Sequence, residues 1–124
     1  MTGHIFWRVH IRASKDAARE RVLARVVGAL GTQVERTSFD PYWKDDRDHV
    51  ATLTTPLEHP GPAAGVLETF AVASRLRLGR WYAAAPQIEA GGAWSFELNA
   101  GADADGGGFS VPGVVFVSLC ATGE

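Results

Sequence analysis

The chain has a single cysteine, Cys120, among its 124 residues. One cysteine excludes an intramolecular disulfide and a zinc knuckle, and because Cys120 ends an apolar run we expect it to be a small buried hydrophobe. The longest apolar run, residues 111–121, is too short to cross a membrane. No basic segment followed by an apolar core, as in a signal peptide, precedes the first strand pattern. We therefore expect a cytoplasmic protein with no membrane association.

Signatures of catalysis are also missing from the sequence. It contains no Gly-x-Ser-x-Gly nucleophile elbow and no phosphate-binding loop ending in Gly-Lys-Ser/Thr. The formal net charge is −2, so nucleic acid and anionic membranes are not expected as general partners. We predict no cofactor, no metal ion and no catalytic residue, and the sequence leaves open whether the protein is an enzyme.

What the sequence does contain, at residues 4–12, is a strand pattern. Apolar residues alternate there with polar, cationic or aromatic ones, and side chains alternate across a β-strand. One face carries Ile5, Trp7, Val9 and Ile11, and the other carries His4, Phe6, Arg8, His10 and Arg12. We expect the apolar face to pack beneath helices and the cationic face to stay open, unless the C-terminal strands cover it.

Two helices are expected from capping residues and spacing. Ser14 is a suitable N-cap, apolar residues recur at helical spacing from Ala18 to Leu30, and Gly31 suits the C-terminal end. A second helix should begin at Pro62, which fits a first helical turn, and should end between residues 75 and 79. The residues that share one face of it are Ala63, Val66, Leu67, Phe70 and Ser74.

Further strands are expected around these helices, at residues 33–39, 49–55, 80–85, 94–99 and 114–120. The strand at 33–39 is polar enough for a sheet edge. The strand at 114–120 is apolar on both faces, which suits the interior of a sheet. The segment 42–48 has the composition of a charged connector.

The order β-α-β-β-α-β followed by a β-β pair predicts an α+β fold. Its first six elements resemble the ferredoxin-like split βαβ arrangement, an antiparallel sheet with two helices on one face. That arrangement makes the first and third strands neighbours and implies that the strand at 80–85 lies on the other side of the first. We expect one α+β domain over residues 1–124. The resemblance implies no activity, because this fold hosts many unrelated functions.

The candidate ligand-binding residues are Arg8, His10, Arg12 and His49. The resemblance would bring His49, on the third strand, beside the cationic face of the first. Guanidinium and imidazole groups suit a small anionic ligand, and a homodimer paired through such faces could enclose a pocket, although a simply solvated face has the same pattern. His4 and His10 are roughly 20 Å apart on one strand, so they cannot hold one metal ion. RNA is not expected, since an RNA-stacking sheet usually exposes several aromatic rings.

The second candidate site lies in the segment 42–48, and its partner-binding residues are Tyr42, Trp43, Asp45, Asp46 and Asp48. Tyrosine and tryptophan surrounded by charge are typical of protein interfaces, although the two rings could instead fold back over the core. Lys44 and Arg47 interleave with the aspartates and offer charge compensation, so a bound divalent cation is not expected.

These observations favour a small, cytoplasmic, non-enzymatic binding domain that acts through a protein partner. An inhibitor or immunity-type protein that masks a basic surface is a concrete form of this function. The alternative is a small-molecule-binding protein or enzyme with a pocket on the sheet face, lined by Arg8, His10, Arg12 and His49. The alternative requires a concave, largely enclosed cavity beside those residues.

Overall fold

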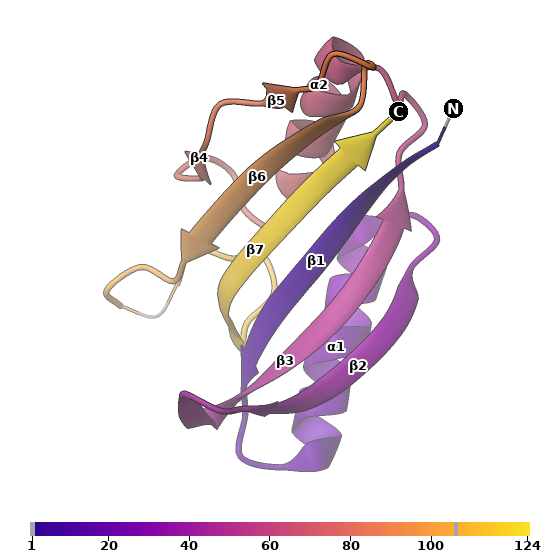
Figure 1. Cartoon of the computed structure of the whole chain (residues 1–124). Helices are drawn as coiled ribbons and strands as arrows, with labels where there is room; N and C mark the ends of the chain where they lie inside the picture. The colour runs from indigo at the N-terminus through magenta and orange to yellow at the C-terminus, as the bar shows by residue number, and fades with distance from the viewer. Residues whose placement is uncertain (1, 106) are drawn as a thin grey trace.

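The protein is a twisted antiparallel sheet with two helices on one face (Figure 1). A computed structural model describes residues 2–105 and 107–124. Its elements are β1 (Gly3–Arg12), α1 (Asp16–Leu30), β2 (Glu35–Tyr42), β3 (Asp45–Pro56), α2 (Pro62–Ala73), β4 (Tyr82–Ala83), β5 (Gln87–Ile88), β6 (Trp94–Gly101) and β7 (Val114–Gly123). The predicted α+β class is confirmed. Neither helix in this described part of the chain has both the length and the apolar character that a membrane crossing requires.

Strand β1 lies inside the sheet, between β3 and β7. Its predicted alternation is confirmed, because Ile5 and Trp7 are fully buried while Phe6 and Arg8 on the opposite face are exposed. The indole Nε1 of Trp7 donates a hydrogen bond of 2.9 Å to Thr55 Oγ1, so the polar atom of this large core side chain is satisfied. Each fully buried apolar side chain of β1 stabilises the fold by roughly 1.5–3 kcal/mol.

The strand order is β2-β3-β1-β7-β6-β4, and β5 also pairs with β6. The first and third strands are neighbours, β2 is an edge strand and β7 lies inside the sheet, as predicted. The placement of residues 80–85 beside β1 is wrong, because β7 occupies that position and Tyr82–Ala83 forms only the short edge strand β4. Pro86 has no N–H to donate to a ladder, whereas β7 is apolar enough to lie between two strands.

The predicted connector at 42–48 is mostly strand. Strand β2 extends to Tyr42 and β3 begins at Asp45, so Trp43 and Lys44 alone form the turn. The added length of β3 places Asp48 opposite Arg12, and the Arg12 Nε donates to Asp48 Oδ1 at 2.7 Å. Local residue spacing could not predict this Arg12–Asp48 contact, because the two residues are far apart in the sequence.

Helix α1 buries Val22, Leu23, Val26 and Leu30 against the sheet. It begins at Asp16 with Lys15 in the N-cap position, and no side chain caps it, so Ser14 does not have its predicted role. The predicted end at Gly31 is confirmed. Gly31 has a φ of 64°, a left-handed conformation that glycine adopts without steric cost.

Helix α2 packs on the sheet through small residues. A Cβ added at Gly65 would come within 2.3 Å of the Trp94 indole of β6, and the fully buried Thr69 donates to the Gly65 carbonyl at 2.7 Å. Only part of the predicted apolar face of Ala63, Val66, Leu67, Phe70 and Ser74 meets the sheet. Val66 packs against the core and the Phe70 ring centre lies 5.3 Å from that of Phe96 of β6, whereas Leu67 is 71% exposed. The bulk of Trp94 requires a small residue at position 65.

Replacing Gly65 and Gly28 with alanine should change stability in opposite directions. Gly65→Ala is expected to lower the free energy of unfolding by about 1–3 kcal/mol, because the new methyl group overlaps the Trp94 ring. Gly28→Ala in α1, where the added Cβ would meet no atom within 4 Å apart from its chain neighbours and the backbone of α1, should raise it by up to about 1 kcal/mol. Urea denaturation measures both values. A stabilising Gly65→Ala would contradict the packing of α2 on Trp94.

Candidate functional site

The sheet face that the helices leave open carries a row of polar side chains. Arg8 of β1 lies opposite Thr52 of β3 and Ser118 of β7, and Ser118 lies opposite Asn99 of β6. Paired residues project to the same face, so guanidinium, hydroxyl and amide groups follow one another across four strands. With the neighbouring Phe6 and the carboxylate of Glu97, these residues line a groove of about 400 Å³.

Arg8 and Arg12 differ in how far they are available to a ligand. Arg12 is held by Asp48 at 2.7 Å and by Asp45 at 3.5 Å. Arg8 is exposed, and within residues 2–105 and 107–124 its guanidinium has no carboxylate partner. Of the predicted ligand-binding arginines, Arg8 is thus the one that can receive an anion without breaking an existing pair.

His10 is buried between aromatic rings. Its ring centre lies 4.8 Å from that of Tyr42 and 5.2 Å from that of Phe116, both in edge-to-face geometry. Burial lowers the pKa of His10, the positive charge of Arg8 lowers it further, and Asp48 partly opposes this shift. A largely buried, neutral imidazole between two rings contributes to packing rather than to ligand binding.

His49 lies on the other face of the sheet, so its predicted place beside Arg8 and His10 is wrong. The register pairs His49 with Ile11, whose side chain is fully buried beneath the helices. The His49 ring packs against Phe39 with 5.8 Å between ring centres. His49, Ala51 and Leu53 are two residues apart along one strand, so their side chains project to the same face. The sequence alone therefore already indicated that His49 lies on the buried face.

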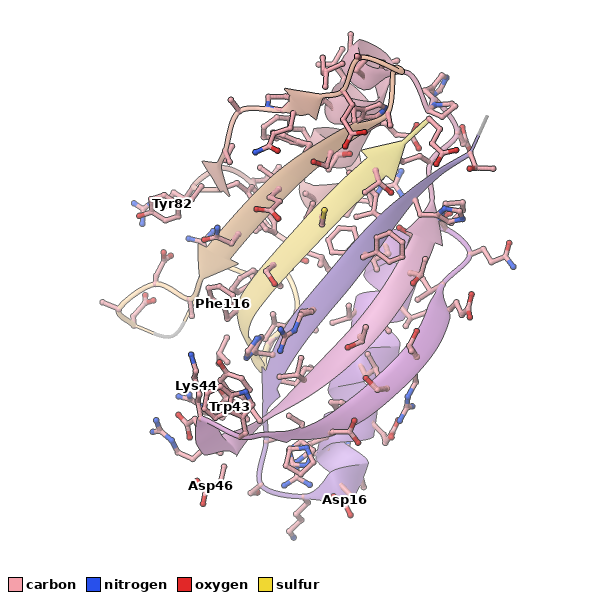
Figure 2. All side chains as sticks on the ribbon, viewed as in Figure 1. Asp16, Trp43, Lys44, Asp46, Tyr82 and Phe116 are labelled. Carbon is pink, nitrogen blue, oxygen red and sulfur yellow. The ribbon has the colours of Figure 1, made fainter. Side chains whose placement is uncertain are left out.

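The turn between β2 and β3, which we call the hairpin tip (residues 42–48), presents an exposed indole. Trp43 is 82% exposed, and Figure 2 shows it with Lys44 and Asp46 at one end of the sheet. The Lys44 Nζ lies 4.9 Å from the centre of the Trp43 ring, and the Tyr42 and Trp43 ring centres are 6.2 Å apart. Tyr42 is half-buried against His10, so only one of the two predicted aromatic residues is open to a partner.

The aspartates of the hairpin tip are largely occupied by arginines. Asp45 accepts hydrogen bonds from the Arg47 side chain at 2.8 and 3.0 Å and from the Arg47 backbone N–H at 3.1 Å. These bonds, together with the nearby charge of Arg12, lower the pKa of Asp45 to about 2. Asp48 is buried and bound to Arg12. Asp46 is the aspartate of the tip that is exposed and has no ion pair with another described residue. The tip is therefore close to charge balance, and it is not a strongly acidic surface.

A chain of four rings connects the hairpin tip with the middle of the sheet, and sequence analysis did not find it. Trp43 contacts Tyr42, Tyr42 contacts His10, and His10 contacts Phe116, all in edge-to-face arrangements. Edge-to-face pairs contribute roughly 0.5–1.5 kcal/mol each beyond their buried area. The rings come from β1, β7 and the β2–β3 hairpin, so only the strand order brings them together.

A second cavity, of about 560 Å³, lies at the other edge of the sheet. Arg77 is almost fully buried there, donates to the Gly101 carbonyl and to Asp103 at 2.9 Å each, and lies over the Phe109 ring. Arg80 binds the same Asp103 carboxylate at 3.1 Å. These contacts fasten the loop after β6 to the segment after α2, which is a structural role.

Comparisons with protein-family models, curated proteins and solved structures give no match to this chain. Any conclusion about function therefore rests on the geometry described above. No three His, Cys, Asp or Glu side chains among residues 2–105 and 107–124 converge as metal ligands would. The arrangement offers two surfaces, an ion-paired tip with an exposed indole and an open groove beside Arg8.

Replacing each arginine that holds the hairpin tip should show which pair stabilises it. Arg12→Ala is expected to lower the free energy of unfolding by about 2–3 kcal/mol, because it leaves the buried Asp48 carboxylate without its partner. Arg47→Ala should cost much less, since Arg47 and Asp45 are both solvent-accessible. Chemical denaturation measures the two changes, and equal costs would contradict the structural role of Asp48.

The lowered pKa of His10 should make the protein less stable in mild acid. As the pH falls through the unfolded-state pKa of about 6.5, the unfolded chain takes up a proton that folded His10 resists, so unfolding is favoured. His10→Gln should therefore lose less stability than the wild type between about pH 7.5 and about pH 5.5. Urea denaturation at both pH values tests this, and an unchanged difference between them would contradict the burial of His10.

Proposed function

We propose that this protein is a non-enzymatic binding protein that recognises a protein partner through its hairpin tip. The observation that carries the proposal is Trp43, a tryptophan that is 82% exposed on a turn whose flanking residues are held in place. Exposed tryptophans on ordered surfaces are the side chains that most often contribute large shares of binding free energy at interfaces.

The isolated chain gains little from a tryptophan at this position. Two-residue hairpin turns favour Asn-Gly and related pairs because these adopt positive φ. Trp43 and Lys44 do not have positive φ, so turn geometry does not explain either residue. The indole is also not needed as a cover for the core, a role that Tyr42 performs against His10. A binding role accounts for the exposed ring.

Ion pairs hold the tip in the free chain. Arg12 links β1 to Asp48 and Asp45 of β3, and Arg47 binds Asp45 from within the tip. An ordered surface loses less conformational entropy on binding than a flexible loop does. The chemistry of the tip fits a partner surface with an apolar pocket for the indole, an anionic group near Lys44 and a cationic group near Asp46.

An inhibitor or immunity-type role remains the concrete form of this function that we propose. From the sequence we expected an acidic surface that masks a basic surface of the partner, and we now propose a different mode of contact. Most of the acidic charge of the tip is neutralised by its own arginines, so burial of the indole, rather than masking of a basic surface, supplies the binding energy. Cytoplasmic location remains a prediction from sequence.

The alternative, binding of a small anionic ligand, is supported by one observation. Arg8 has no carboxylate partner in the described residues, and Thr52, Ser118 and Asn99 place hydrogen-bonding groups in the same groove. The groove lies on the open sheet face, and His49 does not contribute to it. Without a wall that encloses the ligand, the groove favours a weak or extended ligand.

For the fold, we infer that residues 1–124 form one domain and that the sheet is a variant of the ferredoxin-like split βαβ arrangement. Support comes from the order β2-β3-β1-β7 with both helices on one face. In this variant β7 takes the fourth position, and β4, β5 and β6 are inserted between α2 and β7.

Replacing Trp43 with alanine tests the proposed function. Wild-type protein, Trp43→Ala and Leu78→Ala serve as baits in a lysate of the organism that makes the protein, and quantitative mass spectrometry compares the captured proteins. Leu78 is 85% exposed outside the tip and is the matched control. We expect a protein that wild type and Leu78→Ala retain and Trp43→Ala loses, and that, once purified, binds Trp43→Ala roughly 30-fold more weakly by calorimetry.

All three baits should have the same melting temperature, because Trp43 and Leu78 contribute little to the core. If every protein captured by the wild type is captured equally by Trp43→Ala, the hairpin tip is not the binding surface.

A further inference from the structure

The cavity of about 560 Å³ at the β4 edge of the sheet carries more positive than negative charge. Its charged side chains are Arg77, Arg80 and Asp103, and both arginines donate to the same carboxylate oxygen, at 2.9 and 3.1 Å. The almost fully buried Arg77 by itself neutralises Asp103 and fastens the loop that follows β6. The positive charge of Arg80 is not needed for either task.

Arg80 has hydrogen-bond donors that the protein does not use. Its side chain is 78% exposed and donates to Asp103 through Nη1, while Nε and Nη2 have no partner among residues 2–105 and 107–124. The buried Nε of Arg77 likewise has no partner in this part of the chain. A guanidinium binds a phosphate or carboxylate through two parallel hydrogen bonds. The Nε and Nη2 edge of Arg80 provides such a pair.

The backbone of Arg80 adopts a conformation that is costly for arginine. Its φ is 57°, and it is the one non-glycine residue with positive φ in the described part of the chain. Gly79 before it has a φ of 71°, in the same left-handed region. Glycine and asparagine adopt this region at a lower cost than arginine does. Backbone geometry therefore does not explain an arginine here, whereas a role for its guanidinium does.

Two aromatic side chains line the same cavity. Trp81 is half-buried against the core, and its Nε1 donates to the Arg77 carbonyl at 2.8 Å, which holds the indole in place. Tyr82 of β4 is 73% exposed, and Figure 2 shows it at the edge of the sheet, apart from Trp43 at the hairpin tip. Such rings are stacking surfaces for a planar aromatic ligand.

We propose that this cavity binds a small aromatic anion, a planar ring that carries a phosphate or a carboxylate group. The anionic group accepts hydrogen bonds from Nε and Nη2 of Arg80, and the ring stacks against Trp81 and Tyr82. A volume of about 560 Å³ is in the range of small-molecule sites. The cavity shares no lining residue with the groove beside Arg8 and lies away from the hairpin tip, so the inference does not depend on the proposed function.

Titration of the full chain with small probes, followed by ¹H–¹⁵N NMR, tests the proposal. Adenosine monophosphate and indole-3-acetate are aromatic anions, adenosine lacks the anionic group, and inorganic phosphate lacks the ring. We expect an aromatic anion to bind with a dissociation constant below about 1 mM, and adenosine and phosphate to bind at least about 10-fold more weakly. The tighter of the two aromatic anions shows whether the anionic group is a phosphate or a carboxylate. The shifted signals should include the backbone N–H of Arg80 and the indole N–H of Trp81.

Arg80→Asn separates binding from stability, because asparagine fits positive φ better than arginine does. This variant should keep or raise the melting temperature, yet bind the tighter aromatic anion about 10-fold more weakly. Arg25→Gln, which removes an exposed guanidinium from α1, is the matched control and should bind like the wild type.

Substitutions at Tyr82 test the stacking. Tyr82→Ala should weaken binding about 10-fold, because it removes an exposed ring that lines the cavity. Tyr82→Phe keeps the ring and should bind like the wild type.

Failure of both aromatic anions to bind at about 1 mM would overturn the proposal. Arg80→Asn that binds as tightly as Arg25→Gln would overturn it as well, because Arg80 would then not hold the anionic group. Phosphate that binds as tightly as adenosine monophosphate would overturn the role of the rings. Shifts at Arg8 and Ser118 in place of Arg80 and Trp81 would put the ligand in the groove of the open face and overturn the assignment to this cavity.

Discussion

The register of β1 between β3 and β7 determines both the core of the protein and its open face. Because β1 pairs on both edges, each of its side chains is committed to the helix-covered face or to the open face. Trp7 fills the core on one side, and Arg8 stands on the other. The same register brings Arg12 to Asp48 and thereby holds the hairpin tip. Core and candidate site are thus set by one pairing.

The open face and the hairpin tip have different properties, although they share strands. The groove on the open face is lined by hydroxyl, amide and guanidinium groups together with the Glu97 carboxylate and the Phe6 ring. The tip combines ion-paired flanking residues with an exposed ring that contributes little to the core of the free chain. This difference is why we propose protein recognition rather than small-molecule binding. The aromatic contacts from Trp43 through His10 connect the tip mechanically to the centre of the sheet.

Local patterns predicted the elements well and their long-range arrangement less well. The alternation of β1, the end of α1 at Gly31 and the interior position of β7 follow from period and residue type. The position of β7 beside β1 and the extension of the hairpin depend on contacts between distant residues. One error concerns a face. His49 has the same parity as Ala51 and Leu53, so its position on the buried face could have been predicted from the sequence. The close packing of α2 on Trp94 could not, because it depends on a contact between residues far apart in the chain.

Protein recognition through the hairpin tip requires that its backbone be ordered around the exposed indole. Backbone ¹⁵N relaxation of the free protein measures this through the order parameters of Trp43 and Lys44. We expect values of about 0.85, equal to those of the central strands, together with a solvent-accessible Trp43 indole N–H. Order parameters below about 0.6 at the turn would show instead a mobile loop that has to become ordered upon binding.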